Sequence, residues 1–137
     1  MSNADFFPME RNRYFYGKLL TVRDFEIEQR YNRSKTQLFN RLRFGAGVVC
    51  GLGVAASDDT TLLIESGMAL DYQGRMIMLE EPMLRKLQMI EGQESLLGQS
   101  TGYLCMAYDE TDIEPVNAVG ADTGESRQFN MTREGCR

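Results

Sequence analysis

The chain has 137 residues, of which 42% are hydrophobic and 26% are charged, and this composition is that of an ordinary globular protein long enough to fold as one domain. Its net charge of −5 argues against a general affinity for nucleic acid or for anionic membranes. The sequence contains no histidine, which excludes Ser-His-Asp and Cys-His nucleophile systems and HExxH metal sites.

Residues 1–20 form an N-terminal arm that is rich in aromatic side chains and is interrupted by Pro8 and Gly17. Tyr and Phe are favoured anchors at protein interfaces. The arm therefore packs either on the chain's own domain, which we expect first, or on a neighbouring subunit. Its candidate partner residues are Phe6, Phe7, Tyr14, Phe15 and Tyr16.

The clearest helix is predicted over residues 21–44, with Thr21 as its N-cap and Asp24 completing a capping box. An apolar stripe runs along the helix, and Gly45 follows as the C′ residue in a left-handed conformation. At roughly 35 Å the helix is long for a small domain. It lies across a sheet or meets helices of other copies, and Tyr31 and Leu38 join the candidate partner surface.

A run of cations lies in this helix at Arg30, Arg33, Lys35, Arg41 and Arg43. Because the polar residues Glu26, Glu28 and Gln29 directly precede the run, a solvated helix face is favoured over an RNA site.

The stretch FGAGVVCGLGV, residues 44–54, resembles a phosphate-binding loop only in its glycine content. Phosphate-binding glycines follow a strand and open a helix, whereas these follow a helix and lead into a strand. We therefore reject a phosphate site. Gly51 and Gly53 instead predict a bulge or a close backbone approach in a buried strand.

The remainder is predicted to be β-rich over 47–135. Expected strands are 61–65, 68–71 and 75–79, the last two joined by a hairpin through Gly74, then 84–90, 102–110 and 126–133. A loop or short helical turn is expected at 93–98, and a polar excursion at 111–127. The predicted fold is α+β, with one long N-terminal helix packed on a mostly antiparallel sheet or small barrel. After the arm, residues 21–137 form a single domain, which belongs either to a short chain or to the N-terminal part of a longer one.

No residue pattern predicts a catalytic, cofactor-binding or metal site. The acidic run at 109–114 lacks the layout of an EF-hand and is interpreted as a solvated strand end and turn. Cys50, Cys105 and Cys136 form no CxxC pair, which indicates reduced thiols, and the first two lie in apolar runs and are expected in the core. No signal peptide or membrane span is predicted, so assembly in the cytoplasm is expected.

Four segments taken in order resemble the N-terminal domain of a poorly characterised family associated with phage tails and phage-tail-like contractile injection systems. They are residues 14–54, 64–79, 102–116 and 125–135, which carry YFYGKLLTVRDF, GVVCGL, GMALDYQGR and YDETDIEPV. The sequence departs from the family at Phe44 and Ala46, where a histidine and a large aromatic are more usual.

The resemblance implies a structural, non-enzymatic component of such a particle, at the baseplate, a fibre attachment or a tail accessory position. The implied partners are other tail or injection-system subunits and further copies of the chain in cyclic symmetry, with no nucleic acid or membrane. The alternative is a small β-rich module that binds a carbohydrate or cell-surface ligand through the polar loop near 111–127. A carboxylate-based hydrolase is the third and least favoured hypothesis.

Overall fold

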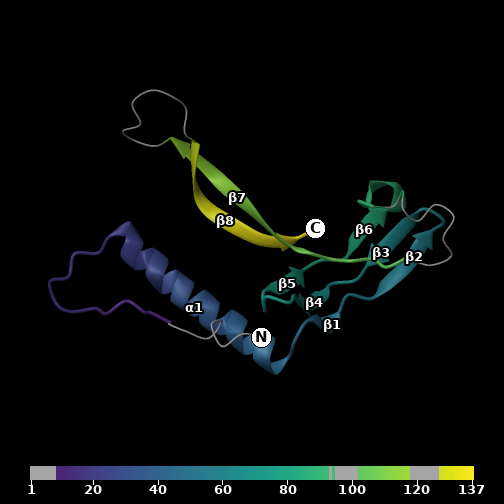
Figure 1. Ribbon diagram of the computed structural model, residues 1–137. Helices are drawn as coiled ribbons and strands as arrows, with labels where there is room; N and C mark the ends of the chain where they lie inside the picture. The colour runs from purple at the N-terminus through teal and green to yellow at the C-terminus, as the bar shows by residue number, and fades with distance from the viewer. Residues whose placement is uncertain (1–8, 93, 95–101, 118–126) are drawn as a thin grey trace. The chain divides into compact units, whose positions relative to one another are not determined.

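The structure is a computed structural model that describes residues 9–92, 94, 102–117 and 127–137. The chain divides into two compact units. Unit 1 consists of Met1–Ala46 and Tyr72–Arg75, and unit 2 consists of Gly47–Asp71 and Met76–Arg137. The predicted α+β class, with one long helix near the N-terminus and antiparallel sheets, is confirmed (Figure 1).

Helix α1, Val22–Arg43, has the two ends predicted from the sequence. At its start, the Thr21 backbone N–H donates to the Asp24 carboxylate at 2.9 Å and closes the capping box. At its end, Phe44 N donates to the Asn40 carbonyl at 2.9 Å, and Gly45 adopts a left-handed φ of +72°. Asp24 in the first turn and two arginines in the last turn also complement the helix dipole.

The turn Tyr72–Arg75 completes unit 1 and contacts the second half of α1. The Asn40 side chain donates to the Gly74 carbonyl oxygen at 3.0 Å. A Cβ atom added to Gly74 would lie 2.0 Å from the Gln37 carbonyl oxygen, and Gly74 also has a φ of +80°. Only glycine therefore allows the turn to lie this close to the helix.

Unit 2 begins with six short strands that form two three-stranded antiparallel sheets. Their bounds are β1 Gly47–Gly51, β2 Val54–Asp58, β3 Thr61–Ile64, β4 Gly67–Leu70, β5 Met76–Leu79 and β6 Met83–Lys86. The sheet orders are β1-β4-β5 and β2-β3-β6. Since β1 leads directly into β2, β3 into β4 and β5 into β6, the six strands amount to three strands that each bend once from one sheet into the other. The predicted hairpin through Gly74 joins β4 to β5 and is confirmed.

The bend lies where the sequence predicted a bulge or close backbone approach. Gly51 and Leu52 have left-handed φ values of +63° and +56°, and the β1–β4 register shifts just before them. Across the bend, Leu52 N donates to the Ser66 carbonyl at 3.2 Å, and Glu65 N donates to the Gly53 carbonyl at 2.8 Å. A Cβ on Gly51 would lie 2.1 Å from the Ser66 oxygen, so this glycine is required by backbone packing and not by a ligand.

The buried apolar side chains of the described residues all lie on the middle and third bent strands. They are Ile64, Ala69, Leu70, Ile77 and Leu79. Ala69 pairs with Ile77 across β4 and β5, and β5 alternates between exposed methionines and these buried residues. The alternation predicted for this segment therefore does identify the core.

The second half of unit 2 corrects the sequence prediction. The strand expected at 84–90 ends at Lys86 and continues as a 3₁₀ turn, η2, Leu87–Met89. The strand expected at 102–110 is wrong, because residues 102–107 form no strand and β7 runs instead over Tyr108–Asn117. Strand β8 covers Arg127–Cys136, longer than expected, and pairs with β7 along their length.

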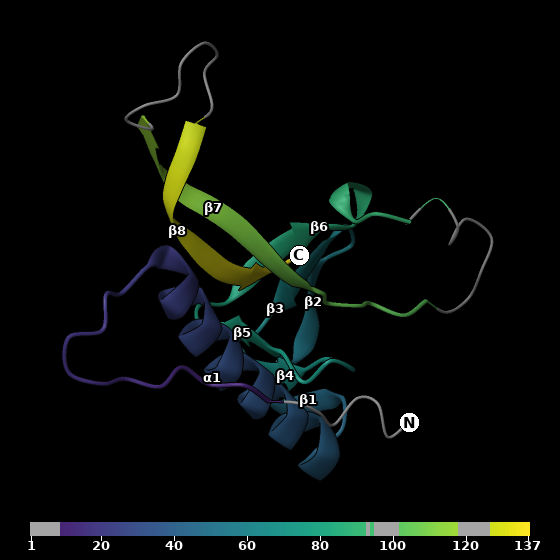
Figure 2. The ribbon, with the colours of Figure 1, turned by 60° about the vertical axis from the view of Figure 1, so that its left-hand side comes forward.

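Of the turn expected at 93–98, only residue 94 lies within the described residues. Residues 118–126 of the expected polar excursion also lie outside them. Figure 2 shows β7 and β8 as a twisted two-stranded ribbon, which we call the β7–β8 ribbon.

Candidate interaction surfaces

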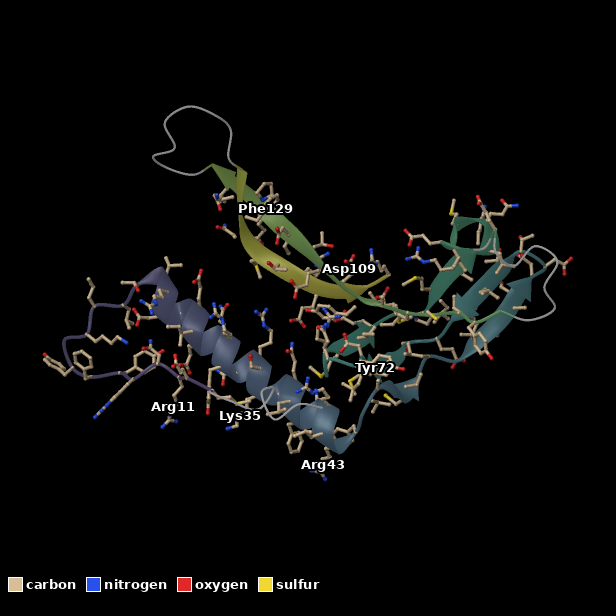
Figure 3. All side chains as sticks on the ribbon, in the orientation of Figure 1. Arg11, Lys35, Arg43, Tyr72, Asp109 and Phe129 are labelled. Carbon is tan, nitrogen blue, oxygen red and sulfur yellow. The ribbon has the colours of Figure 1, made fainter. Side chains whose placement is uncertain are left out.

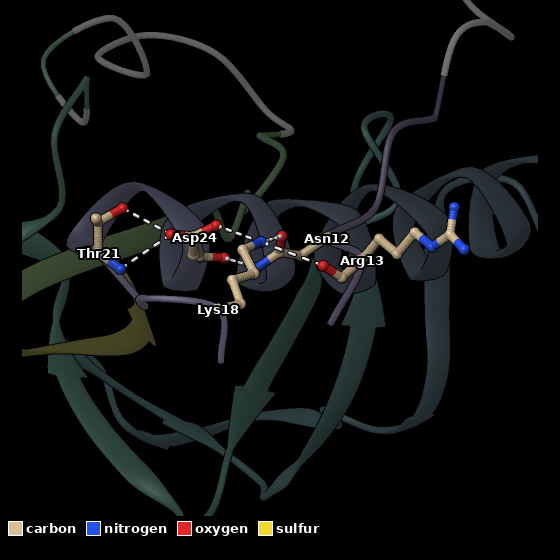
Figure 4. A network of polar contacts seen from close by, with 5 residues as sticks. All are labelled: Asn12, Arg13, Lys18, Thr21 and Asp24. Carbon is tan, nitrogen blue, oxygen red and sulfur yellow. Dashed lines mark hydrogen bonds and ion pairs between the residues drawn. The ribbon is translucent and has the colours of Figure 1, made fainter. Parts of the chain in front are cut away.

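A network of polar contacts holds the described part of the arm on the first turn of α1 (Figure 4). The Lys18 ammonium forms an ion pair with Asp24 at 2.7 Å and donates to the Asn12 side chain and to the Arg13 carbonyl. Asn12 in turn donates to the Asp24 backbone carbonyl at 3.4 Å. Asp24, which the sequence identified as part of the capping box of α1, therefore also positions the arm.

These contacts hold the pKa of the Asp24 carboxyl well below its usual value of 3.8. The main cause is the hydrogen bond from Lys18, followed by the bonds from the Thr21 hydroxyl and backbone N–H. Asp24 therefore remains ionised, and the network stays intact, well into the acid range.

The arm presents its aromatic side chains to solvent and does not bury them within unit 1. Tyr14 is 54% exposed, Phe15 is 65% exposed and Tyr16 is fully exposed. The expectation that they pack into the chain's own core is therefore wrong for these three residues. Phe6 and Phe7 lie outside the described residues.

The other two predicted partner residues, Tyr31 and Leu38, are half-buried on α1. The exposed aromatic side chains of the helix are Phe25 near its N-terminus and a pair at its C-terminal end. Phe39 and Phe44 meet edge to face at 6.3 Å, and the Arg43 guanidinium lies 5.4 Å from both ring centres. Figure 3 labels Arg43 at this end of the helix.

Aromatic residues and arginine are the side chains most enriched at interface hot spots. The sequence signal for this cluster was available: aromatics at positions i and i+5 with an arginine beside the second.

The acidic run was predicted to be a solvated strand end and turn, but the turn is wrong because the whole run lies within β7. Glu110, Asp112 and, from β8, Glu134 occupy one face of the β7–β8 ribbon, and we call this the acidic face. Glu110 pairs directly with Glu134, and the Thr132 hydroxyl donates to Asp112 at 2.9 Å. Two like charges opposite each other in a β ladder repel.

Tyr108 lies at the end of the acidic face, and its hydroxyl donates to Glu110 at 2.8 Å. Burial raises the pKa of Tyr108, and the neighbouring Glu110 and Glu134 raise it further. The phenol therefore remains a neutral donor to the acidic face across the physiological pH range.

The opposite face of the β7–β8 ribbon is apolar in its middle part, whereas Asp109, Thr111 and Arg133 occupy the same face nearer Tyr108. Ile113 pairs with Met131, and Pro115 pairs with Phe129, which is labelled in Figure 3. Phe129 is 45% exposed and Met131 is 54% exposed, and no described side chain of β7 or β8 is buried. Strand β8 contacts β5 of the bent sheet, and the ribbon is half-buried at the end that carries Tyr108 and Cys136. Because a two-stranded ribbon is marginally stable by itself in water, the exposed apolar side chains farther along it favour a partner.

The prediction that Cys50 and Cys105 lie in the core is wrong. Cys50 and Cys105 are exposed and Cys136 is half-buried, all as free thiols. Cys50 lies on the edge strand β1, whose side chains are exposed throughout, and Cys105 lies in the stretch that forms no strand.

Within the described residues, no group of His, Cys, Asp and Glu side chains assembles a site for a metal ion. No helix among these residues combines the length and apolar character needed to cross a bilayer.

Comparisons of the chain with known protein families and with characterised proteins find no match.

Proposed function

We propose that this chain is a structural, non-enzymatic assembly component of a phage tail or a phage-tail-like contractile injection particle. The baseplate, a fibre attachment and a tail accessory position are the places that the sequence resemblance suggests. Particle assembly begins in the cytoplasm in this proposal, and other tail or injection-system subunits and further copies of the chain are the partners.

The observation that carries the assembly role is the mismatch between buried and exposed apolar side chains. Five apolar residues of the described chain are buried, whereas exposed large apolar residues occur on the arm, α1, the bent sheet and the β7–β8 ribbon. Burial of apolar surface is the main favourable term in folding and association, so large apolar side chains left exposed on every one of these elements favour contacts with other molecules. An assembly subunit buries such surface against its neighbours.

The alternative of a carbohydrate-binding module loses part of its basis. It placed recognition in a polar loop over 111–127, but residues 111–117 belong to strand β7. The described residues that such a module would use are side chains of a paired strand, and we keep ligand binding only as an outcome of the test.

The test is fractionation of a native lysate by ultracentrifugation. We expect the protein to sediment with sheath and tube proteins, and imaging of that fraction gives its position in the particle. A variant with Tyr14, Phe15 and Tyr16 replaced by Ala should be folded but lost from the particles. Tyr103→Ala is the matched control, because Tyr103 is a 93% exposed tyrosine outside the arm.

Recovery of the unaltered protein only as a slow, free species contradicts the proposal and moves ligand screening to the front. If the triple variant fails to fold, the arm belongs to the chain's own core, and particle incorporation is then judged from the unaltered protein alone.

A further inference from the structure

The two units of the chain carry opposite net charge. Unit 1 contains ten Lys and Arg against five Asp and Glu, which gives +5, and unit 2 contains five against fifteen, which gives −10. The overall charge of −5 conceals this division. A chain with one basic unit and one acidic unit is electrostatically complementary to a second copy of itself.

On unit 1, the positive charge is concentrated in the second half of α1, which has no acidic residue after Glu28. Arg30 and Arg33 are one turn apart, and Arg41 follows Arg30 by three further turns, so all three lie on one side of the helix. We call them the basic stripe. Arg30 and Arg33 are exposed, and within the described residues no ion pair involves any of the three.

Arg41 gives the basic stripe a polar group that is unsatisfied in the single chain. Its Nε is buried and has no hydrogen-bond partner among the described residues. Because this atom is buried, a second copy does not reach it, and Arg41 contributes to the basic stripe through its positive charge.

On unit 2, the acidic face of the β7–β8 ribbon has a matching spacing. Side chains three apart on a helix, such as Arg30 and Arg33, have Cβ atoms about 5–6 Å apart. Directly opposed side chains in an antiparallel ladder, such as Glu110 and Glu134, have Cβ atoms about 4.5–5.5 Å apart. Two adjacent arginines can therefore each meet one of the two glutamates, and their charge relieves the repulsion between them.

We propose that the basic stripe of one copy binds the acidic face of the β7–β8 ribbon of a second copy. This inference rests on the proposed role in assembly and names the partner and the surface. A nucleic acid is the less favourable occupant of the basic stripe, because the −10 charge of unit 2 repels it. Since the two surfaces differ, the contact is heterologous, and repeating it produces a ring when the rotation closes.

The experiment measures the mass of the purified full chain by light scattering over a range of protein and salt concentrations. We expect self-association in about 50 mM salt that weakens by about tenfold or more in about 500 mM salt, as exposed charge pairs require. Arg30→Glu with Arg33→Glu should abolish it, and so should Glu110→Lys with Glu134→Lys. An equimolar mixture of these two variants should associate again, because each reversed surface then meets a reversed partner.

The matched control is Arg11→Glu with Arg13→Glu, which makes the same change in net charge on exposed arm residues away from the stripe. It should associate like the unaltered chain. A monomer at every salt concentration overturns the inference, and so does a helix variant that associates normally. The four substitutions are also combined in one chain. If each pair of substitutions destabilises the monomer and the combined variant regains the stability of the unaltered chain while remaining monomeric, the two surfaces meet within one chain and the inference is overturned.

The outcome is separable from that of the proposed function. If the Arg30 and Arg33 variant still sediments with tail particles, the assembly role stands and this contact is wrong. If the unaltered chain self-associates when purified but never sediments with particles, the contact stands and the particle assignment is wrong.

Discussion

The bent sheet of β1–β6 and the β7–β8 ribbon belong to the same unit but are built in opposite ways. The sheet has short strands, yet it contains every buried apolar side chain of the described residues and two glycines whose backbones approach other backbone atoms too closely for a Cβ. The ribbon has the longest strands of the chain, at ten residues each, and buries no described side chain. Long pairing without burial leaves both of its faces for other contacts.

The difference separates two sources of stability. Backbone hydrogen bonds contribute little net free energy when water competes for them, whereas apolar burial contributes about 25 cal/mol per Å². The sheet is therefore expected to be stable by itself, and the ribbon is expected to gain stability from a partner. The predictions below test this contrast, beginning with the largest effect.

Ile77→Ala should lower the free energy of unfolding of the purified chain by about 2–4 kcal/mol, because the side chain is 3% exposed in the sheet and leaves a cavity. Phe129→Ala on the ribbon should lower it by less than about 1 kcal/mol, since a 45% exposed ring loses little burial. Urea unfolding followed by circular dichroism gives both values under conditions where the chain is monomeric. Equal losses for the two variants would mean that the ribbon has a core of its own.

Gly51→Ala should destabilise the sheet by about 2 kcal/mol or more, because the new Cβ meets the Ser66 carbonyl and the residue must also remain left-handed. Gly45→Ala is the matched control. Gly45 is also left-handed at φ +72° but has nothing within 4 Å of an added Cβ, so it should lose only about 1 kcal/mol. Thermal unfolding of both variants measures the difference. If the two losses are equal, the close approach at the bend contributes nothing.

Acidification should loosen the arm on α1 before it disrupts the sheet. The pKa of Asp24 is lower in the folded chain than its usual 3.8, so its contribution to stability is complete above that value and is lost progressively as the pH falls from that value through the pKa of the folded chain. Amide hydrogen exchange of residues 18–25 at about pH 5 and about pH 3, corrected for intrinsic rates, should show more frequent opening at the lower pH, although Asp24 remains ionised while the arm is bound. Asp24→Asn should remove the pH dependence, and Glu26→Gln should leave it intact. Identical behaviour of the Asn variant and the unaltered chain would exclude Asp24 as the group responsible.

Local signals in the sequence predicted much of the fold. The capping box at Thr21 and the left-handed Gly45 fixed the ends of α1 to within one residue. The alternation and the turn through Gly74 predicted the β4–β5 hairpin, because a two-residue period and a tight turn depend on neighbours in the chain. The order of glycines after a helix correctly indicated close backbone packing at Gly51.

Apart from the misplaced strand at 102–110, the failures concern which side chains are covered. Cys50 was expected in the core because its neighbours are apolar, but it lies on an edge strand that no other strand covers on one side. The exposure of the arm aromatics and of the cluster around Arg43 depends in the same way on what packs against them. The apolar character of a residue predicts that its burial is favourable, but it does not predict which other residues cover it.

The sequence by itself determined the helix, its ends and the central hairpin, because each depends on residues a few positions apart. The close approaches that require glycine were decided by the tertiary structure, since Gly51 meets Ser66 and Gly74 meets Gln37. Tertiary pairing decided where the last strands begin. Residues 102–107 form no strand, although Ala107 exchanges two backbone hydrogen bonds with Arg137. Most of the acidic run 109–114 pairs residue by residue with β8 and so becomes part of β7. The acidic face and the apolar face of the ribbon exist only through this register, since they join side chains about twenty residues apart.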